Sequence, residues 1–271
     1  MKPLNRNSIS SIRTSIQCKQ FRTMVKIKKI IPFLLIMIFS AVMTNAQTTY
    51  VMSIGVSNYA DSNNNLSQTT KDAKSFRDVM SNHTDKITLL TSSYANRDNI
   101  LKKLNSLSKL AKADDKLIIF YSGHGYPGGI YPYDEPISYQ EINDILKRSK
   151  AKAKICIFNA CHTGSVSEVK DKTQVYKAPS SGNIIYIMSS RADEYSYEHP
   201  IAGHCIFTTG MLKGLRGKAD ANNDKKVTVS ELFNYVYNDV VHTTTSLDLS
   251  QHPQLIGVKS IADAVIVDWN N

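Results

Sequence analysis

Two short stretches contain the residues of this sequence that are best suited to covalent chemistry. YSGHG places His124 between two glycines, and NACHTG places Cys161 directly after an apolar run. A cysteine thiolate is a strong nucleophile, and an imidazole within hydrogen-bond reach can hold the thiol as thiolate and later protonate a leaving amine. The two residues together predict acyl transfer by a cysteine–histidine dyad.

The glycines of these stretches favour the same chemistry. Glycines on both sides of His124 allow a substrate backbone to approach closely, and they leave the Gly125 amide free to point into the site. The backbone N–H groups of Gly125 and Cys161 would then form an oxyanion hole for the tetrahedral intermediate.

Two other interpretations of such residues are open. Cysteine is often a small core residue, which is the interpretation we prefer for Cys156 in KICIF and for Cys205 in GHCIFTTG. His124, Cys161 and His162 could also bind zinc, although no closely spaced CxxC or HxxxH pair supports a metal site.

Both candidate residues follow apolar segments that read as buried strands. Strands are expected over residues 49–59, 86–91, 116–125, 153–164 and 183–190, with a short last one near 254–257. Helices are expected over 72–80, 99–112, 206–216 and 229–243, and around Ile142, Ile145 and Leu146.

The helix over 99–112 has the clearest amphipathic pattern, because Ile100, Leu104, Leu107 and Leu110 are spaced by three or four residues. Uninterrupted apolar strands separated by helices predict an α/β fold, a three-layer α/β/α sandwich with a mainly parallel central sheet. In such sheets the reacting groups collect beyond the carboxyl ends of the strands, which is where both candidates occur.

The positive charge of the chain is concentrated at its start. The formal net charge is +10, yet residues 1–46 contain eight basic residues and no acidic one. Residues 47–271 therefore carry 25 basic residues against 23 acidic ones. The overall charge is thus no argument for binding to nucleic acid, and none is expected.

Residues 24–46 have the pattern of a signal peptide. Three lysines precede the apolar stretch Ile30–Val42, and Ala46 is a small residue of the kind that a signal peptidase requires. We predict cleavage before Gln47, so that residues 1–46 are a signal peptide with a basic N-terminal extension and residues 47–271 are one exported domain. Either Met1 or Met24 could be the true start.

Export has consequences for the membrane and for the thiols. The apolar stretch is shorter than a membrane span requires, so no stable span is expected after signal removal, although an uncleaved anchor is the alternative. The mature protein would be periplasmic or extracellular. It would keep three cysteines, an odd number, so at least one thiol stays free unless it pairs between chains.

These stretches resemble the caspase-like cysteine peptidases, and among them the metacaspases and their bacterial relatives. IGVSNY resembles the first strand of the family, KDAKSFRDVM its first helix, YSGHG its histidine strand and IFNACHTG its nucleophile turn. SSRADEYSYE, IFTTGMLKGLRGKAD and QHPQLIG resemble later elements, so the similarity spans nearly all of residues 47–271. It implies a caspase-like fold in which Cys161 is the nucleophile and His124 the general base or acid.

The resemblance also implies substrate-binding residues. It places Ser122 in the pocket for the P1 side chain, and it places Asn159 where metacaspases commonly have an aspartate that binds a P1 lysine or arginine. An amide can accept a hydrogen bond from a cation but supplies no charge. Four carboxylates could supply that charge from neighbouring loops: Asp61, Asp193, Glu194 and Glu198.

The stretch DANNDKKVTVSE, residues 220–231, has the donor spacing of a calcium loop. Oxygen ligands at positions 1, 3, 5, 9 and 12 would be Asp220, Asn222, Asp224, Thr228 and Glu231. Lys225 stands where such loops have a glycine. The alternative is a solvated turn in which Thr228 or Ser230 caps the last helix.

We therefore predict an exported cysteine endopeptidase that acts on peptide or protein substrates, with basic P1 residues as the leading preference. It needs no cofactor for its chemistry, and Ca²⁺ is a candidate ligand. The alternative is a catalytically silent caspase-like fold that binds peptides or a partner protein, for which Asn159 is the motive. The long polar loop over 165–181 is a candidate site of activating cleavage. The sequence gives no prediction of the oligomeric state.

Overall fold

The structure, a computed structural model, describes residues 47–161, 181–199 and 201–270. The expected signal peptide, His162 and almost all of the 165–181 loop lie outside the described residues. A six-stranded sheet in the order β10-β8-β7-β3-β1-β2 forms the centre of the domain. Its strands are β1 (Thr49–Gly55), β2 (Ile87–Thr91), β3 (Lys116–Ser122), β7 (Ala153–Asn159), β8 (Ile184–Met188) and β10 (Gln254–Gly257).

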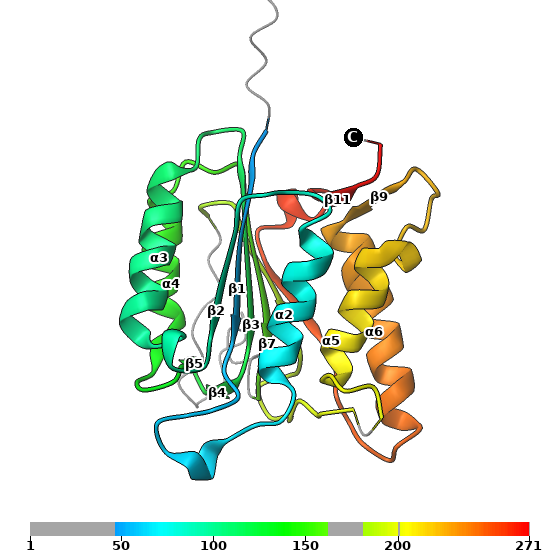
Figure 1. The fold of residues 1–271 in the computed structure, drawn as a ribbon. Helices are drawn as coiled ribbons and strands as arrows, with labels where there is room; N and C mark the ends of the chain where they lie inside the picture. The colour runs from blue at the N-terminus through cyan, green and yellow to red at the C-terminus, as the bar shows by residue number, and fades with distance from the viewer. Residues whose placement is uncertain (1–46, 162–180, 200, 271) are drawn as a thin grey trace, which may run out of the picture. The chain divides into compact units, whose positions relative to one another are not determined.

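The sheet is mainly parallel, and helices cover both of its faces (Figure 1). All neighbouring strands pair in parallel except β10, which pairs antiparallel with β8. Helices α2 (Thr69–Met80), α5 (Ile206–Lys213) and α6 (Val229–Thr245) pack on one face, and α3 (Arg97–Leu110) and α4 (Tyr139–Lys147) pack on the other. The predicted three-layer α/β/α fold is confirmed.

Strand β3 explains why the central strands read as unbroken apolar runs. Leu117, Ile119 and Tyr121 pack in the core under α3 and α4, whereas Ile118 and Phe120 pack in the core under α2, α5 and α6. Alternate side chains thus enter two separate cores, so the positions from Leu117 to Tyr121 are apolar on both faces of the strand.

One expected core residue is placed wrongly by the helical pattern. Ile100, Leu104 and Leu107 are buried on α3 as predicted, but Leu110 is 57% exposed. The helix ends at Leu110, and the extended residue Ala111 enters the core instead. The 3.6-residue period places a side chain correctly only while the helix continues.

The structure also contains short elements that the sequence pattern did not indicate. A three-stranded sheet consists of β4 (His124–Tyr126), β5 (Gly129–Tyr131) and β6 (Ile137–Ser138), so the expected strand over 116–125 ends at Ser122. Strands β9 (Lys226–Thr228) and β11 (Val265–Asp268) form an antiparallel pair. Single turns of 3₁₀ helix are η1 (Ser62–Asn64), η2 (Ser92–Tyr94) and η4 (Lys259–Ile261), and the π turn η3 (Gly214–Lys218) follows α5.

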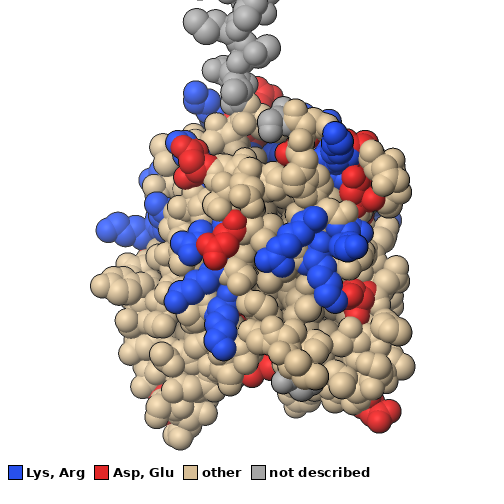
Figure 2. All heavy atoms as spheres, turned by 45° about the vertical axis from the view of Figure 1, so that its right-hand side comes forward, with Lys and Arg blue, Asp and Glu red and all other residues tan. Residues whose placement is uncertain are grey.

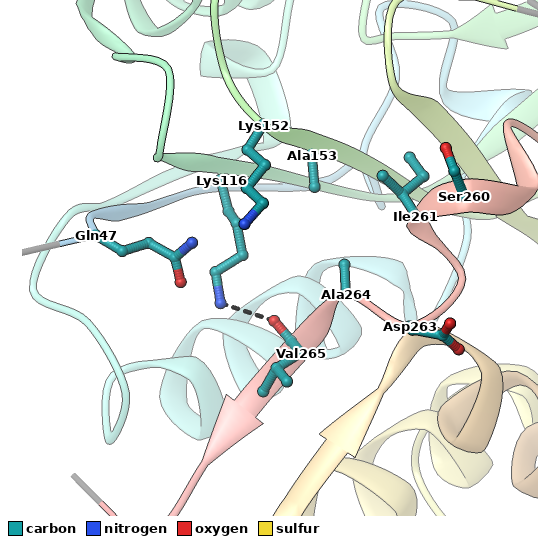
Figure 3. Close-up of a pocket in the computed structure, with 9 residues that line it drawn as sticks. All are labelled: Gln47, Lys116, Lys152, Ala153, Ser260, Ile261, Asp263, Ala264 and Val265. Carbon is teal, nitrogen blue, oxygen red and sulfur yellow. Dashed lines mark hydrogen bonds between the residues drawn. The ribbon is translucent and has the colours of Figure 1, made fainter.

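A hollow of about 330 Å³ lies where β3 begins, at the opposite end of that strand from Ser122 (Figure 3). The side chains of Lys116 and Lys152 enter it, and the Lys116 ammonium donates a hydrogen bond of 2.7 Å to the carbonyl oxygen of Val265. Burial lowers the pKa of Lys116. This contact joins the central sheet to β11.

The face formed by α2, α5 and α6 shows Lys and Arg side chains mixed with acidic ones (Figure 2). Arg77 of α2 pairs with Asp78, and Lys213 of α5 pairs with Asp239 of α6. Among the described residues, no helix is long and apolar enough to cross a membrane.

Candidate active site

The register of two adjacent strands brings the candidate residues to the same edge of the sheet. Ser122 at the end of β3 lies opposite Asn159 at the end of β7, and the Gly123 N–H donates to the Asn159 carbonyl oxygen at 3.2 Å. His124 and Cys161 each lie two residues beyond this pair. The segments that follow β3 and β7 therefore leave the sheet side by side.

Gly125 lies directly against the backbone of Cys161. A Cβ atom added at Gly125 would come within 2.5 Å of the Cys161 carbonyl oxygen and 3.0 Å of the Ala160 Cβ atom. Any larger residue at Gly125 would push the two strand ends apart, so the sequence needs glycine here for close approach. The predicted oxyanion role of the Gly125 and Cys161 amides stays a prediction.

The three described cysteines differ in accessibility. Cys161 is partly exposed, whereas Cys156 and Cys205 are buried. Burial also raises the pKa of the Cys156 and Cys205 thiols, which keeps both protonated. The core placement predicted for Cys156 and Cys205 is confirmed, and Cys161 is left as the accessible thiol of the described chain.

A backbone carbonyl orients the imidazole of His124. The Nε2 atom lies 2.8 Å from the carbonyl oxygen of Asn64, in η1. Because a carbonyl oxygen can only accept a hydrogen bond, Nε2 must carry the proton. In the neutral ring Nδ1 is then the basic nitrogen, the atom that can take a proton from a thiol.

Two tyrosines hold the backbone of His124. The His124 N–H donates to the hydroxyl oxygen of Tyr59 at 2.7 Å, and the hydroxyl of Tyr121 lies 2.8 Å from the His124 carbonyl oxygen. The Tyr59 ring also packs against the imidazole, with 4.8 Å between ring centroids. A negative charge on Cys161 helps to raise the pKa of Tyr59, after the larger effect of burial, so this ring lies near both candidate residues.

Tyr59 and Asn64 were not among the predicted site residues, although a signal for them existed. Both follow β1, which pairs in parallel with β3. The loop after β1 therefore leaves the sheet at the same edge as His124, and the chain after IGVSNY could have been included on that ground.

The peptide before Cys161 is fixed by the next strand of the sheet. The Ala160 N–H donates to the Ser189 Oγ atom at 3.1 Å, and the Ser189 N–H donates to the Phe158 carbonyl oxygen at 2.9 Å. Ser189 directly follows β8. The turn that presents Cys161 is thus built on three adjacent strand ends, β3, β7 and β8.

A buried carboxylate meets the two residues expected to bind the P1 side chain. Asp72 lies in the first turn of α2 and is fully buried. Its Oδ2 atom accepts hydrogen bonds from Ser122 Oγ at 2.8 Å and from Asn159 Nδ2 at 3.3 Å. Asn159 also has a buried Oδ1 atom that accepts no hydrogen bond from the described residues.

The carboxylate that contacts Ser122 and Asn159 is not one of the four expected from neighbouring loops. Asp61 caps η1 and Glu198 accepts hydrogen bonds from the Ser67 and Gln68 N–H groups. Glu194 pairs with His252, and Asp193 is exposed. The carboxylate that reaches Ser122 and Asn159 comes instead from helix α2. Acidic residues are common in the first turn of a helix, so the position of Asp72 does not mark it as a site residue.

The candidate calcium loop makes hydrogen bonds with itself. Both carboxylate oxygens of Asp220 accept backbone N–H groups, from Asp224 and Lys225, and Asn222 Oδ1 accepts the Asp224 N–H as well. Lys225 adopts a left-handed φ of 63°, so the sharp turn is made without the usual glycine.

The last calcium ligand of the predicted set has another partner. Glu231 forms a capping box with Thr228 at the start of α6, as the alternative interpretation of this loop expected for Thr228. The described residues contain no group of three or more His, Cys, Asp or Glu side chains placed to share a metal ion. Calcium binding stays a prediction, and the zinc alternative involves His162, outside the described residues.

Comparisons with known proteins agree with this arrangement. The model of the caspase domain, Peptidase C14, matches residues 48–263. Metacaspase-1 of Debaryomyces hansenii is 25% identical over 205 residues, which cover 63% of this chain and 46% of the yeast protein, so the chain spans about half the length of this curated relative. The crystal structure of protein GSU0716 from Geobacter sulfurreducens superposes with a TM-score of 0.62 at 13% identity, covering 82% of this chain and 98% of that one.

The family match covers the strands that carry His124 and Cys161, the helix that carries Asp72 and the sheet that aligns them. The solved structure supports the fold alone, because its sequence identity is low. The resemblance found in the sequence is confirmed, and the chain belongs to the caspase-domain family of cysteine peptidases.

Proposed function

We propose that this protein is a cysteine endopeptidase that cleaves peptide bonds after lysine or arginine. The observation that supports it best is the buried Asp72 carboxylate, joined to Ser122 and Asn159 at the strand ends that lead to His124 and Cys161. A fixed negative charge beside a nucleophile favours a cationic side chain next to the scissile bond.

The proposed reaction uses groups of this chain and water. The Cys161 thiol gives its proton to Nδ1 of His124, and the thiolate attacks the carbonyl carbon of the scissile bond. The C–N bond breaks while the imidazolium protonates the leaving amine, and a thioester remains on Cys161. Water then hydrolyses the thioester with His124 as general base, and no cofactor takes part.

The alternative, a catalytically silent binding module, is weakened by the same carboxylate. That alternative rests on Asn159, which supplies no charge at this position. Asp72, however, places its Oδ2 atom 3.3 Å from the Asn159 Nδ2 atom. We therefore favour the enzyme, and the test below includes an arm for the binding module.

The test uses fluorogenic peptides with arginine, lysine, citrulline or aspartate at P1. We expect hydrolysis after arginine and lysine, and a loss of at least ~1,000-fold in kcat for Cys161→Ala or His124→Ala. Asp72→Asn should lower kcat/KM for the arginine peptide roughly 10- to 150-fold, the value of a hydrogen bond to a charged group, and leave the citrulline peptide almost unchanged. Asp98→Asn, at an exposed carboxylate on α3, is the matched control.

Two results would overturn the proposal. Full activity in the Cys161→Ala variant would remove the nucleophile from the mechanism. Binding of peptides without turnover, together with slow and His124-independent alkylation of Cys161 by iodoacetamide, would favour the binding module.

We propose a separate, structural role for calcium at the loop Asp220–Lys225. The support is the donor spacing of Asp220, Asn222 and Asp224 and the left-handed turn at Lys225. A cation here would act on stability rather than on the reaction, because the side-chain hydrogen bonds of Asp220, Asn222 and Asp224 to described residues stay within residues 220–226 and do not reach the segments around His124 and Cys161.

A further inference from the structure

The Asp72 carboxylate is fully occupied by donors of the protein itself. Oδ2 accepts from Ser122 and Asn159, and Oδ1 accepts from His204 Nδ1 at 2.9 Å and from the Cys205 N–H at 3.2 Å. A substrate cation that binds this carboxylate must therefore replace one of four existing hydrogen bonds, or share an oxygen with it.

His204 is the donor that is open to replacement. Ser122, Asn159 and Cys205 are between 0% and 5% exposed, whereas the His204 side chain is 23% exposed. The three buried donors are fixed by β3, β7 and the start of α5. Of the four residues, His204 is the one a ligand can meet from solvent.

The remaining contact of the His204 ring is weak. Its Nε2 atom lies 3.4 Å from the Ser75 hydroxyl oxygen, one turn along α2 from Asp72. Gly203, directly before it, adopts a left-handed φ of 69°, and no atom lies within 4 Å of the position that a Cβ atom would take there. The His204 ring is thus held mainly by Asp72, while the His204 carbonyl oxygen accepts the His199 N–H at 2.8 Å and fixes the backbone beside it.

We propose that His204 is a specificity-determining residue that competes with the P1 cation for Asp72. This inference rests on the proposed function, since it concerns the same carboxylate. The neutral ring donates one hydrogen bond from Nδ1 and is displaced by a lysine or arginine side chain. The protonated ring adds a positive charge, which forms an ion pair with Asp72 and cancels the charge that attracts the substrate.

Competition of this kind makes the preference for basic P1 residues depend on pH. Histidine changes its charge between about pH 5 and 8. Because binding of the cation and protonation of His204 oppose each other, each weakens the other by the same factor. Recognition of arginine should therefore weaken on acidification, whereas recognition of a neutral isostere should not.

Other titratable groups lie near His204 and could also change the ratio with pH. Asp72 faces the ring from α2, and Cys205 is its neighbour in the chain. Glu198 and His199 belong to the segment that pairs with residues 204 and 205. The experiment must separate His204 from these groups and from the dyad.

The experiment measures kcat/KM for two peptides that differ only in arginine or citrulline at P1, from about pH 5.5 to 8.5. The ratio of the two values cancels the ionisation of His124 and Cys161, which affects both peptides. We expect the ratio to fall about tenfold from pH 8.5 to 5.5, the effect of a charge that shifts a neighbouring pKa by one unit, with the change in KM rather than kcat. In His204→Gln the ratio should stay high and flat, and His242→Gln, on the exposed side of α6, should behave as the wild type.

The possible outcomes are distinct. A high wild-type ratio that does not change with pH overturns the role of His204 and leaves the basic P1 preference standing. A fall of equal size in His204→Gln also overturns it, because another group then titrates. A ratio near one at every pH removes the proposed P1 preference itself, and the role of His204 with it.

Discussion

At the scale of single residues, the candidate base is positioned by its backbone as much as by its side chain. Tyr59 accepts the His124 N–H, and Tyr121 lies at the His124 carbonyl oxygen. Burial raises the pKa of both tyrosines, so both hydroxyls keep their protons at neutral pH and remain donors. Asn64 then fixes the direction of the ring through Nε2, while the two tyrosines hold the backbone that carries it.

Tyr59→Phe tests this positioning role. The change keeps the aromatic ring against the imidazole but leaves the His124 N–H without its acceptor, at a cost of about 1–3 kcal/mol. We expect His124 to shift so that its N–H finds another acceptor, which moves the imidazole away from its productive position. The value of kcat should then fall roughly tenfold while KM stays within about twofold, and alkylation of Cys161 by iodoacetamide should slow in parallel. Tyr94→Phe, on a side chain that is 74% exposed, is the control. Unchanged kcat and alkylation rate in Tyr59→Phe would show that the hydroxyl does not position the base.

At the scale of elements, an arginine joins three segments of the chain beside the site's small sheet. Arg97 at the start of α3 pairs with Glu141 of α4 and donates a hydrogen bond to the Pro136 carbonyl oxygen at 2.6 Å. Glu141 also completes the capping box of α4 with Ser138. The Arg97 guanidinium is the main cause that lowers the pKa of Glu141 to about 2.

This pKa shift predicts a loss of stability in acid. The carboxylate of the folded protein binds protons less readily than that of the unfolded chain, whose pKa is near 4.5. The contribution of the ionised Glu141 side chain to the free energy of unfolding is therefore fully present above about pH 5. It is lost as the pH falls from there towards 2. Because the Glu141 side chain is 37% exposed, we discount it to about 1 kcal/mol.

Glu141→Gln keeps the shape of the capping residue and removes its charge. We expect the melting temperature at pH 7 to fall by about 2–4 °C, and the difference from wild type to shrink as the pH falls below about 5 and to vanish only once it falls below the folded pKa of about 2. Glu231→Gln is a matched control, because Glu231 forms the same capping box on α6 but no ion pair among the described residues. Equal effects of the two variants would assign the stabilisation to capping alone.

Elements also show how far the sequence determines the fold and the site. The buried strands and the helices around Phe76, Leu104 and Ile142 follow from their apolar period, because both faces of the sheet are covered. The small sheet β4–β6 could not be predicted, since its two- and three-residue strands are too short for a period. His124 and Cys161 were identified because they follow strands, whereas Asp72 becomes part of the site only through tertiary contacts.

At the scale of the whole molecule, the loop Asp220–Lys225 connects segments that are distant in the sequence. The Trp269 N–H donates to the Lys225 carbonyl oxygen at 2.9 Å, and the Asn270 side-chain amide donates to the Asp224 carbonyl oxygen at 3.0 Å. The loop, which joins η3 to β9 in the sequence, thereby fastens the residues that follow β11. A cation bound here would stabilise the folded domain at a point remote from the chemistry.

Calcium should therefore raise the melting temperature without changing the preference at P1. A ligand that binds only the folded state adds about 2.7 kcal/mol at a concentration of 100 times its dissociation constant, which corresponds to roughly 5–10 °C for a domain of this size. Adding EDTA should reverse the shift, and Asp220→Ala should abolish it. Asp263→Ala, on the turn before β11, should retain it and serves as the control. An identical melting temperature with calcium and with EDTA would show that Asp220, Asn222 and Asp224 serve only to close the turn, because their oxygens then remain with the backbone N–H groups of Asp224, Lys225 and Lys226.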